Sequence, residues 1–338
     1  MTQFTASQRT VLVLGATGSF GAHAAEALIK HGWSVRALSR RPDAARAAAP
    51  QSPIDWIHGD AMDAASVVAA ARGAQLIVHA ANPPNYHNWK GLILPMVESA
   101  IAAARASGAR LVIAGSVYNF APDAGAEIAE DAPQAPATRK GAIRVQVERR
   151  LRAAAKGGVK SLVLRSGDFF GPAAPNSGLK WLTTRSGERL TGVYQPGPSS
   201  VGHAFAYLPD LGETVARLVE AEDRLADFEV FHFRGHWVEG GIGAAVRRAS
   251  GNPRLPIRAF PWPLVWALGP FVELFRELWE MRYLWRAPIG LSNRKLVAFL
   301  GSEPHTPLDQ ALAASLADMG VTLGPQAAAH GAPRLAHA

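Results

Sequence analysis

A glycine-rich turn near the start of the chain has the composition and spacing of a phosphate-binding site. Gly15, Gly18 and Gly21 lie in "VLVLGATGSFGAHAAEALIKHG", after an apolar segment typical of a strand and at the start of a segment with helical periodicity. The first glycine permits a tight turn, the second lets the backbone approach a pyrophosphate, and the third lets helix and strand pack closely. Amides at the start of the helix, backed by its dipole, would bind the anion. An ordinary glycine-rich turn is the alternative, but the context favours a dinucleotide contacted by Gly15, Thr17, Gly18, Ser19, Phe20 and Gly21.

The end of the second apolar segment indicates which dinucleotide would bind. A carboxylate there would receive the ribose 2′-hydroxyl of NAD, whereas arginine favours the 2′-phosphate of NADP. The sequence "LSRRPD" presents Arg40 and Arg41, and the first acid is Asp43, which we expect to cap the following helix. Paired arginines also occur as plain surface charge. We predict NADP as the cofactor, contacted by Arg40 and Arg41, with NAD as the alternative.

The elements that must position these residues alternate along the first 165 residues. Apolar segments predict strands at 10–15, 34–39, 54–59, 76–81, 110–115 and 161–166. Alanine-rich stretches between them, such as 20–32, 64–73 and 94–108, have helical periodicity. Strands that alternate with helices pair in parallel through right-handed crossovers. The sequence therefore predicts an α/β fold with a doubly wound parallel sheet.

The regular alternation ends near "GPAAPNSG" at 171–178, beyond which prolines, glycines and tryptophans become common. We predict a Rossmann dinucleotide-binding domain over 1–172, to which 203–222 returns. The segments 173–202 and 223–323 would form a smaller C-terminal substrate lobe. The tail 324–338 has little to bury, and we expect it to be mobile.

Composition and charge exclude several classes of function. The chain has 338 residues and no cysteine, which excludes disulfides and thiolate metal sites. Its net charge is +8, and the segment 139–165 carries nine lysines and arginines against the single acid Glu148. Such a balance can indicate nucleic-acid binding, but no nucleic-acid-binding motif accompanies it. We expect a solvated helix face near an anionic ligand and no nucleic-acid partner.

Neither a membrane span nor a metal site is predicted. The most apolar stretch, 260–285, is interrupted by Glu273, Arg276, Glu277 and Glu280, well short of the roughly 20 apolar residues that a spanning helix needs. The start of the chain lacks the pattern of a signal peptide, so we expect a cytoplasmic protein without membrane contact. The eleven histidines show no metal-binding spacing beside a carboxylate.

The motifs taken together resemble the extended short-chain dehydrogenase/reductases, the NAD-dependent epimerase/dehydratase superfamily, over nearly the full length. The matching segments are "GATGSFG" (15–21), "HGDAMD" (58–63), "VHAAN" (78–82), "GSVYNF" (115–120), "LRSGDFFGP" (164–172), "HAFAYLPDLGETVARLVE" (203–220) and "LGSEPHTPLDQAL" (300–312). The resemblance implies cofactor contacts from Asp60, Ala61, Ala80, Ala81, Asn82, Asp168 and Phe169. It also implies a homodimer, paired through the helices near 94–107 and 140–155.

The same resemblance assigns the chemistry to a serine, a tyrosine and a lysine four residues after the tyrosine. In this chain Lys140 stands at the tyrosine position and Arg144 at the lysine position, when Glu148 is aligned on the family's glutamate. Ser116 lies two residues before Tyr118, closer than the family's serine, whose usual spacing falls on Ala114. The candidate catalytic residues are therefore Lys140, Tyr118, Arg144 and Ser116, in an altered active site.

Lys140 could take over the proton transfer. Residues four apart share a helix face, so the charge of Arg144 and burial against the cofactor would favour a neutral amine. The phosphates of NADP would favour the charged form, which leaves the balance open. The alternative is that Lys140 and Arg144 only bind the cofactor, where Arg144 can donate to ribose hydroxyls, or lie on a dimer helix without a role in the chemistry. Tyr86 and Tyr118 could each replace the phenol, and His79 is expected to be a hydrogen-bonded core residue.

Aromatic residues in the second half indicate the substrate. Four of nine tryptophans, at 262, 266, 279 and 285, lie in one apolar stretch, which favours a substrate with an apolar body. A sugar nucleotide would need phosphate contacts, for which Arg165, Lys180, Arg185 and Arg189 are the candidates. We expect an NAD(P)-dependent oxidoreductase or epimerase/dehydratase-like enzyme that acts on a small, partly apolar carbonyl or alcohol. The alternative is a non-catalytic NADP-binding redox sensor or scaffold.

Overall fold

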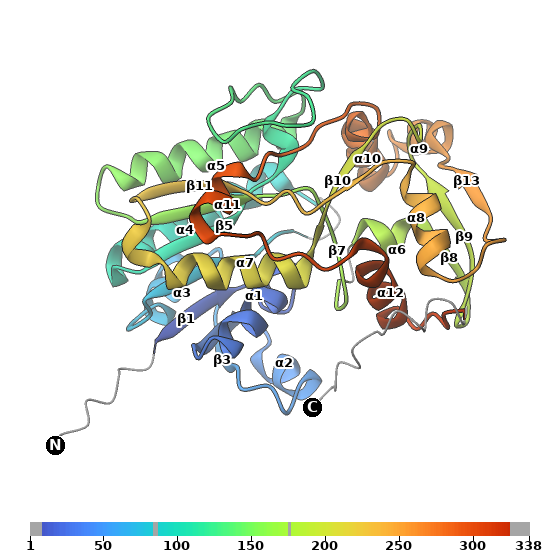
Figure 1. Ribbon diagram of the computed structural model, residues 1–338. Helices are drawn as coiled ribbons and strands as arrows, with labels where there is room; N and C mark the ends of the chain where they lie inside the picture. The colour runs from blue at the N-terminus through green and yellow to red at the C-terminus, as the bar shows by residue number, and fades with distance from the viewer. Residues whose placement is uncertain (1–8, 84–86, 175–176, 325–338) are drawn as a thin grey trace.

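Seven strands form the central sheet in a computed structural model that describes residues 9–83, 87–174 and 177–324 (Figure 1). All of its pairings are parallel. Their order across the sheet is β11 (Phe228–His232), β6 (Ser161–Arg165), β5 (Arg110–Ala114), β4 (Leu76–His79), β1 (Thr10–Leu14), β2 (Ser34–Ser39) and β3 (Asp55–His58). The predicted doubly wound sheet is confirmed. Tyr86 and the tail after Gly324 lie outside the described residues.

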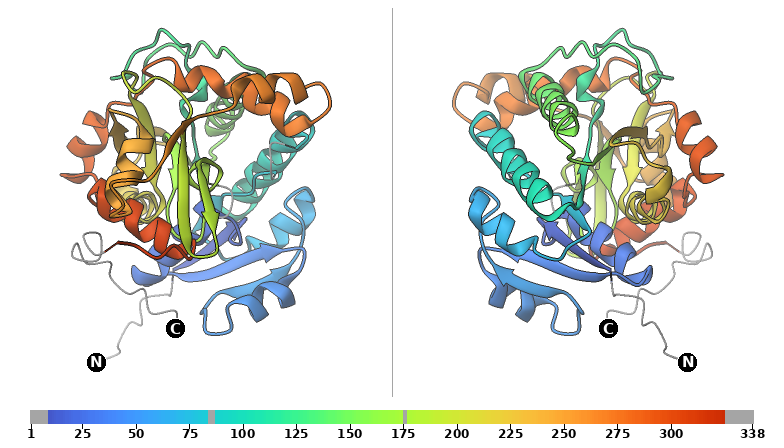
Figure 2. Two further views of the ribbon diagram at one scale, coloured as in Figure 1. Left: turned by 90° about the vertical axis from the view of Figure 1, so that its right-hand side faces the viewer. Right: turned by 90° about the vertical axis from the view of Figure 1, so that its left-hand side faces the viewer.

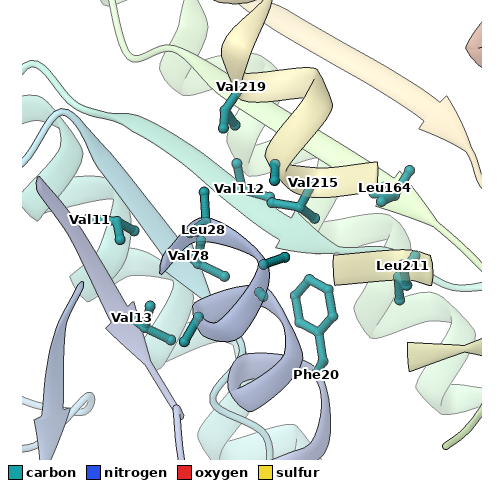
Figure 3. Close-up of a cluster of buried hydrophobic side chains, with 14 of the residues drawn as sticks. Val11, Val13, Phe20, Leu28, Val78, Val112, Leu164, Leu211, Val215 and Val219 are labelled. Carbon is teal, nitrogen blue, oxygen red and sulfur yellow. The ribbon is translucent and has the colours of Figure 1, made fainter. Parts of the chain in front are cut away.

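Successive residues of each strand point to opposite faces of the sheet, and both sets are apolar. Helices therefore cover both faces. Val11 and Val13 pack with α1 (Ser19–Lys30) and α7 (Leu208–Glu220) in the core that Figure 3 shows. Leu12 and Leu14 pack on the other face with α3 (Ala64–Ala70), α4 (Trp89–Ser107) and α5 (Arg139–Ala155). The short helix α2 (Pro42–Ala48) lies against β2 and β3 at the sheet edge.

The strand order reverses direction at β1, which lies between β2 and β4. Crossovers on the two sides of this point run in opposite directions, so a crevice opens at the carboxyl ends of β1 and β4. Gly15 follows β1 and Ala80 follows β4, and their backbones are in close contact at this crevice. The fold therefore brings the glycine turn to the place where doubly wound sheets bind ligands.

The main sheet includes a strand from the segment that the sequence assigned to the smaller lobe. The predicted division returns only 203–222 to the first domain, and α7 does pack against α1 as it implies. The strand β11, assigned to the smaller lobe, instead pairs with β6 over five residues. Its sequence "FEVFH" buries Val230 and Phe231 on opposite faces, which suits a covered strand. The helix α11 (Arg294–Leu300) packs beside it.

The second lobe contains two three-stranded sheets. One has the order β12 (His236–Val238), β10 (His203–Tyr207), β7 (Asp168–Phe170), and the other β13 (Ile257–Ala259), β9 (Arg189–Gln195), β8 (Thr183–Ser186). Helices α6 (Gly178–Leu182), α8 (Ile242–Ala249) and α12 (Leu308–Asp318) complete its apolar core.

A helical hairpin made of α9 (Trp262–Leu268) and α10 (Glu273–Met281) joins the second lobe to the first. Figure 2 shows it in orange, near the end of the teal helix α4 and beside the green helix α5. The 3-10 turns η4 (Arg282–Trp285) and η2 (Val117–Asn119) share an apolar cluster beneath it. A third turn, η3 (Glu222–Arg224), follows α7. The hairpin closes one side of the crevice.

Candidate cofactor and substrate site

The glycine turn has the geometry that a bound pyrophosphate requires. Gly15 has φ +91°, and a Cβ there would lie 2.7 Å from the backbone nitrogen of Ala81. A Cβ on Gly21 would collide with the carbonyl oxygen of Gly15. Gly18 is the N-cap of α1, and no side chain caps the amides of the first turn. These amides remain available to an anion, so the residues present fit a dinucleotide.

A cavity of about 350 Å³ extends from this turn to the second lobe. On the sheet side it is lined by Gly18, Ser19, Phe20, Ala80, Ala81, Asn82, Ser116, Tyr118, Arg144, Asp168 and Phe169, all of which the sequence analysis singled out. The opposite wall includes Trp181, Trp262, Leu274, Leu278, Met281 and Trp285. The fold thus brings the predicted cofactor segments together under an aromatic and aliphatic wall.

The residues predicted to contact the adenosine half lie outside this cavity, along the same sheet edge. Arg40 and Arg41 are exposed directly after β2. Asp60 follows β3, where its carboxylate accepts a hydrogen bond from the amide of Met62 at 2.9 Å, and Ala61 is next to it. The prediction that Asp43 caps α2 is wrong. Its carboxylate lies in the first turn and pairs with the guanidinium of Arg46 at 2.8 Å.

Lys140 is held by the second lobe and is not among the described residues that line the cavity. Its side chain is buried and ion-paired with Glu277 and Glu280, the latter at 2.8 Å. Nζ also donates to the backbone oxygen of Glu277. Burial raises the pKa of the Glu280 carboxyl, but hydrogen bonds from Lys140 and Arg139 outweigh it and hold that pKa below the usual range. The lysine in the expected tyrosine position therefore joins α5 to α10.

Arg144, one turn later on α5, does line the cavity. Its guanidinium lies 3.5 Å from the side-chain oxygen of Asn82 and 4.9 Å above the ring of Trp89. The position suits a donor to ribose hydroxyls, the role that the resemblance implies. Beneath it, burial and then the charge of Arg144 lower the pKa of His79 to about 4. His79 is thus neutral, and its Nδ1 has no hydrogen-bond partner in the described structure, contrary to our expectation of a bonded core residue.

Ser116 and Tyr118 lie together at the turn η2. The Ser116 hydroxyl accepts a hydrogen bond from the amide of Tyr118 at 3.0 Å, and both residues line the cavity. The start of α5 packs so closely on this turn that a Cβ on Gly141 would collide with the carbonyl oxygen of Tyr118. Ser116 and Tyr118 therefore lie on a turn that packs against α5, the helix that also carries Arg144.

One functional candidate escaped the sequence analysis. His203, the first residue of β10, lies 2.8 Å from the carboxylate of Asp168 through Nε2. Its Nδ1 is 2.9 Å from the backbone oxygen of Leu284, and its ring stacks on Trp285 with centroids 3.7 Å apart. The parallel pairing of β7 with β10 creates this contact. The segment was identified as a family motif, but nothing local to it indicates the pairing.

The cations expected near a sugar nucleotide lie elsewhere. Arg165 is buried and makes two hydrogen bonds to Glu148, at 2.8 and 2.6 Å. Burial and then the charge of Arg165 lower the pKa of His232 to about 3. Lys180, Arg185 and Arg189 are exposed. Among the described lining residues, Arg144 is the only lysine or arginine.

The sequence model of the NAD dependent epimerase/dehydratase family matches residues 11–231, most of the chain. The chain belongs to this family. The match covers the glycine turn, the whole parallel sheet up to β11 and the cavity's sheet side. The resemblance drawn from the motifs is confirmed. No curated protein sequence matches the chain.

Solved structures share the fold at low sequence identity. UDP-glucose 4-epimerase from Brucella ovis in complex with NAD is 17% identical with a TM-score of 0.73, covering 94% of this chain and 100% of its own. The Bordetella bronchiseptica enzyme WbmH in complex with NAD+ is 20% identical with a TM-score of 0.67, covering 92% and 98%. The UDP-Glc/GlcNAc 4-epimerase from Campylobacter jejuni is 15% identical with a TM-score of 0.68, covering 92% and 98%.

The described residues offer neither a membrane-spanning helix nor a metal-binding cluster. None of the helices within 9–83, 87–174 and 177–324 is both long and apolar enough to span a bilayer. In the same ranges no three histidine, aspartate or glutamate side chains gather as a metal ion would require.

Proposed function

We propose that this protein is an NAD(P)-dependent oxidoreductase that interconverts a hydroxyl and a carbonyl group on a substrate with an apolar body. The observation that carries this proposal is the cavity, which joins the glycine turn of a dinucleotide-binding family to a wall of tryptophan, leucine and methionine. Ligand sites are mostly apolar and use a few polar groups to orient the ligand. Here those polar groups are Ser116, Tyr118, Arg144 and Asp168.

The geometry supports particular residues as the ones that would hold the cofactor. The turn at 15–21 would bind the pyrophosphate, and Arg144 the nicotinamide ribose, in place of the family's lysine. A bound dinucleotide supplies or accepts the hydride. Arg40 and Arg41 support NADP as the preferred form. Ser116 and Tyr118 would hydrogen-bond the reacting oxygen, while Lys140 maintains the contact between α5 and α10.

The cavity wall supports an apolar substrate. Trp181, Trp262 and Trp285 face the sheet side of the cavity, and Leu274 and Leu278 extend this wall along α10. A sugar diphosphate carries negative charge that needs nearby cations, and none of the basic candidates Arg165, Lys180, Arg185 and Arg189 is among the described lining residues.

A sugar-nucleotide epimerase is the second candidate function. It is favoured by the Brucella and Campylobacter structures, both of which are named as UDP-sugar 4-epimerases and share this fold. The two candidates differ in what the aromatic wall contacts: an apolar substrate would pack on it directly, whereas a UDP-sugar would place polar groups there.

Assays of cofactor oxidation and of UDP-sugar interconversion distinguish the two candidate functions. The protein, supplied with NADPH or NADH, is offered aryl and long-chain alkyl ketones and aldehydes, and separately UDP-glucose and UDP-galactose are tested for interconversion. We expect oxidation of NADPH with the apolar carbonyls and no epimerisation. Epimerisation without carbonyl reduction would establish the second candidate. Tight cofactor binding with neither reaction would contradict both and support the redox-sensor alternative.

A further inference from the structure

We propose that Asp168 is the general base of this cavity when an alcohol is oxidised, and that His203 is a positioning residue held as an imidazolium behind it. This inference rests on the proposed function. The carboxylate of Asp168 lines the cavity with its side chain 23% exposed, whereas His203 is buried behind it. The two side chains meet at 2.8 Å between Oδ2 and Nε2.

The hydrogen bonds of His203 determine its charge. Nδ1 faces the backbone oxygen of Leu284 at 2.9 Å, and a carbonyl oxygen can only accept, so Nδ1 carries a hydrogen. Nε2 faces a carboxylate oxygen of Asp168, so a proton must also lie between these two atoms. We assign this proton to Nε2, so that Nε2–H donates to the carboxylate as Nδ1–H donates to the oxygen of Leu284. His203 is an imidazolium that donates from both nitrogens.

The surroundings of His203 hold it in this orientation. Its ring stacks on Trp285 at an interplanar angle of 3°, and Phe205 packs at 4.8 Å between ring centroids. An indole face stabilises a cation placed over it. Because Leu284 and Trp285 both belong to η4, the second lobe fixes the imidazolium, which in turn fixes Oδ2 of Asp168. Oδ1 is then the oxygen left for a ligand in the cavity.

Two titratable groups near the pair, Tyr283 and His236, are neutral. Burial, and then the charge of Asp168, raise the pKa of the Tyr283 phenol on η4 far above the neutral range. On β12, which pairs with β10, burial and then His305 lower the pKa of His236 to about 4. Neither group carries charge between pH 5 and 8. Glu280 is also near Tyr283, but its charge is balanced by Lys140 and Arg139.

The proposed step balances as follows. The substrate's hydroxyl proton would pass to Oδ1 of Asp168 as the O–H bond breaks, and an oxidised dinucleotide held by the turn at 15–21 would supply the acceptor for the carbinol hydrogen and its bonding pair. The O–H bonding pair becomes the second bond of the carbonyl. Asp168 then releases the proton to solvent through its exposed edge, and His203 keeps both of its protons throughout. Carbonyl reduction is the reverse, with the proton coming from Asp168.

Two variants test the pair in kinetics. Asp168→Asn keeps the size of the side chain and a hydrogen bond to Nε2 but cannot accept a proton, so we expect kcat for alcohol oxidation, measured at saturating cofactor, to fall by about 10²- to 10⁴-fold. His203→Gln can still donate to Oδ2 but carries no charge. We expect it to move the acid limb of the kcat/KM profile to higher pH, because the positive charge that favours the carboxylate is lost. The matched control is His87→Gln, which removes a histidine paired with Glu273 at 2.8 Å on the surface.

A spectroscopic measurement tests the pair without turnover. In histidine-labelled protein free of substrate, ¹⁵N NMR should show both ring nitrogens of His203 protonated at neutral pH, and the second proton should be lost in Asp168→Asn. A neutral His203 in the wild type would overturn the inference, as would an Asp168→Asn variant with wild-type kcat and pH profile. If the wild type turns over neither alcohols nor carbonyls while the NMR result holds, the proposed function fails and the imidazolium–carboxylate pair stands.

Discussion

Lys140 and Glu280 form an ion pair of 2.8 Å between Nζ and Oε2 that joins the start of α5 to α10. The pair connects the dinucleotide-binding domain to the hairpin that supplies Leu274, Leu278 and Met281 to the cavity wall. A lysine thus occupies the position that the family resemblance gives to a catalytic tyrosine. Its contacts are those of a structural residue, which leads to a first prediction.

Lys140→Met should destabilise the protein by about 3 kcal/mol, because Glu277 and Glu280 lose their buried cation and keep only the exposed guanidiniums of Arg139 and Arg276. Turnover per folded molecule should stay within a few-fold of the wild type. Urea unfolding and steady-state kinetics measure the two quantities. Lys156→Met, at the exposed end of the same helix, is the control and should change neither. Wild-type stability with kcat abolished would instead place Lys140 in the chemistry.

The same ion pair predicts an acid-sensitive contribution to stability. The folded-state pKa of Glu280 lies below its ordinary value, because hydrogen bonds from Lys140 and Arg139 outweigh the effect of burial. A carboxyl with a lowered pKa contributes stability above its unfolded pKa, about 4.3, and loses it as the pH falls through the folded pKa. Glu280→Gln should therefore be destabilising at pH 6, and the difference from the wild type should shrink below pH 4. A difference that is constant from pH 6 to pH 3 would contradict the charged contact.

The close packing of α5 on η2 predicts an unusual cost for one added methyl group. A Cβ on Gly141 collides with the carbonyl oxygen of Tyr118, so Gly141→Ala should cost about 1–3 kcal/mol and displace Tyr118 and Ser116 from the cavity wall. Gly157→Ala, just beyond the other end of α5, meets its nearest backbone atom at 3.5 Å and should be nearly neutral. Thermal unfolding of the two variants compares them directly, and equal midpoints would refute the packing argument.

Arg40 and Arg41 predict the preference between the two pyridine dinucleotides. Replacing both with alanine should weaken NADPH binding by about tenfold or more while NADH binding changes little, since a charge-assisted hydrogen bond contributes about 1.5–3 kcal/mol. Fluorescence titration of both cofactors measures this change. Arg105→Ala, on the exposed side of α4, is the control. If the double variant binds NADPH and NADH as the wild type does, the two arginines are plain surface charge.

Local sequence patterns were sufficient to predict the glycine turn and most strands of the main sheet. The spacing of Gly15, Gly18 and Gly21 is a property of one turn, and six of the seven strands of the main sheet lie in a regular alternation. The family motifs assigned Asn82 and Asp168 to the cofactor and Ser116 to catalysis, and all three line one cavity because the carboxyl ends of parallel strands share one sheet edge.

Long-range contacts explain what the sequence could not predict. The partners of Lys140 come from α10, more than 130 residues later, and no sequence pattern near Lys140 indicates that it pairs with two carboxylates. The seventh strand, β11, follows an excursion into the second lobe, and no local pattern distinguishes it from a lobe strand. His203 becomes functional only through the pairing of β10 with β7.

Titration calorimetry with NADPH and NADH tests the central claim most directly, namely that the turn at 15–21 and the amides at the start of α1 hold a dinucleotide beside the apolar cavity. The wild type should bind one molecule per chain, with NADPH bound more tightly. In Gly15→Val the new side chain would collide with the backbone of Ala80 and Ala81, so this variant should bind neither dinucleotide. If the folded wild-type protein takes up neither dinucleotide, in reduced or oxidised form, the proposed function is contradicted.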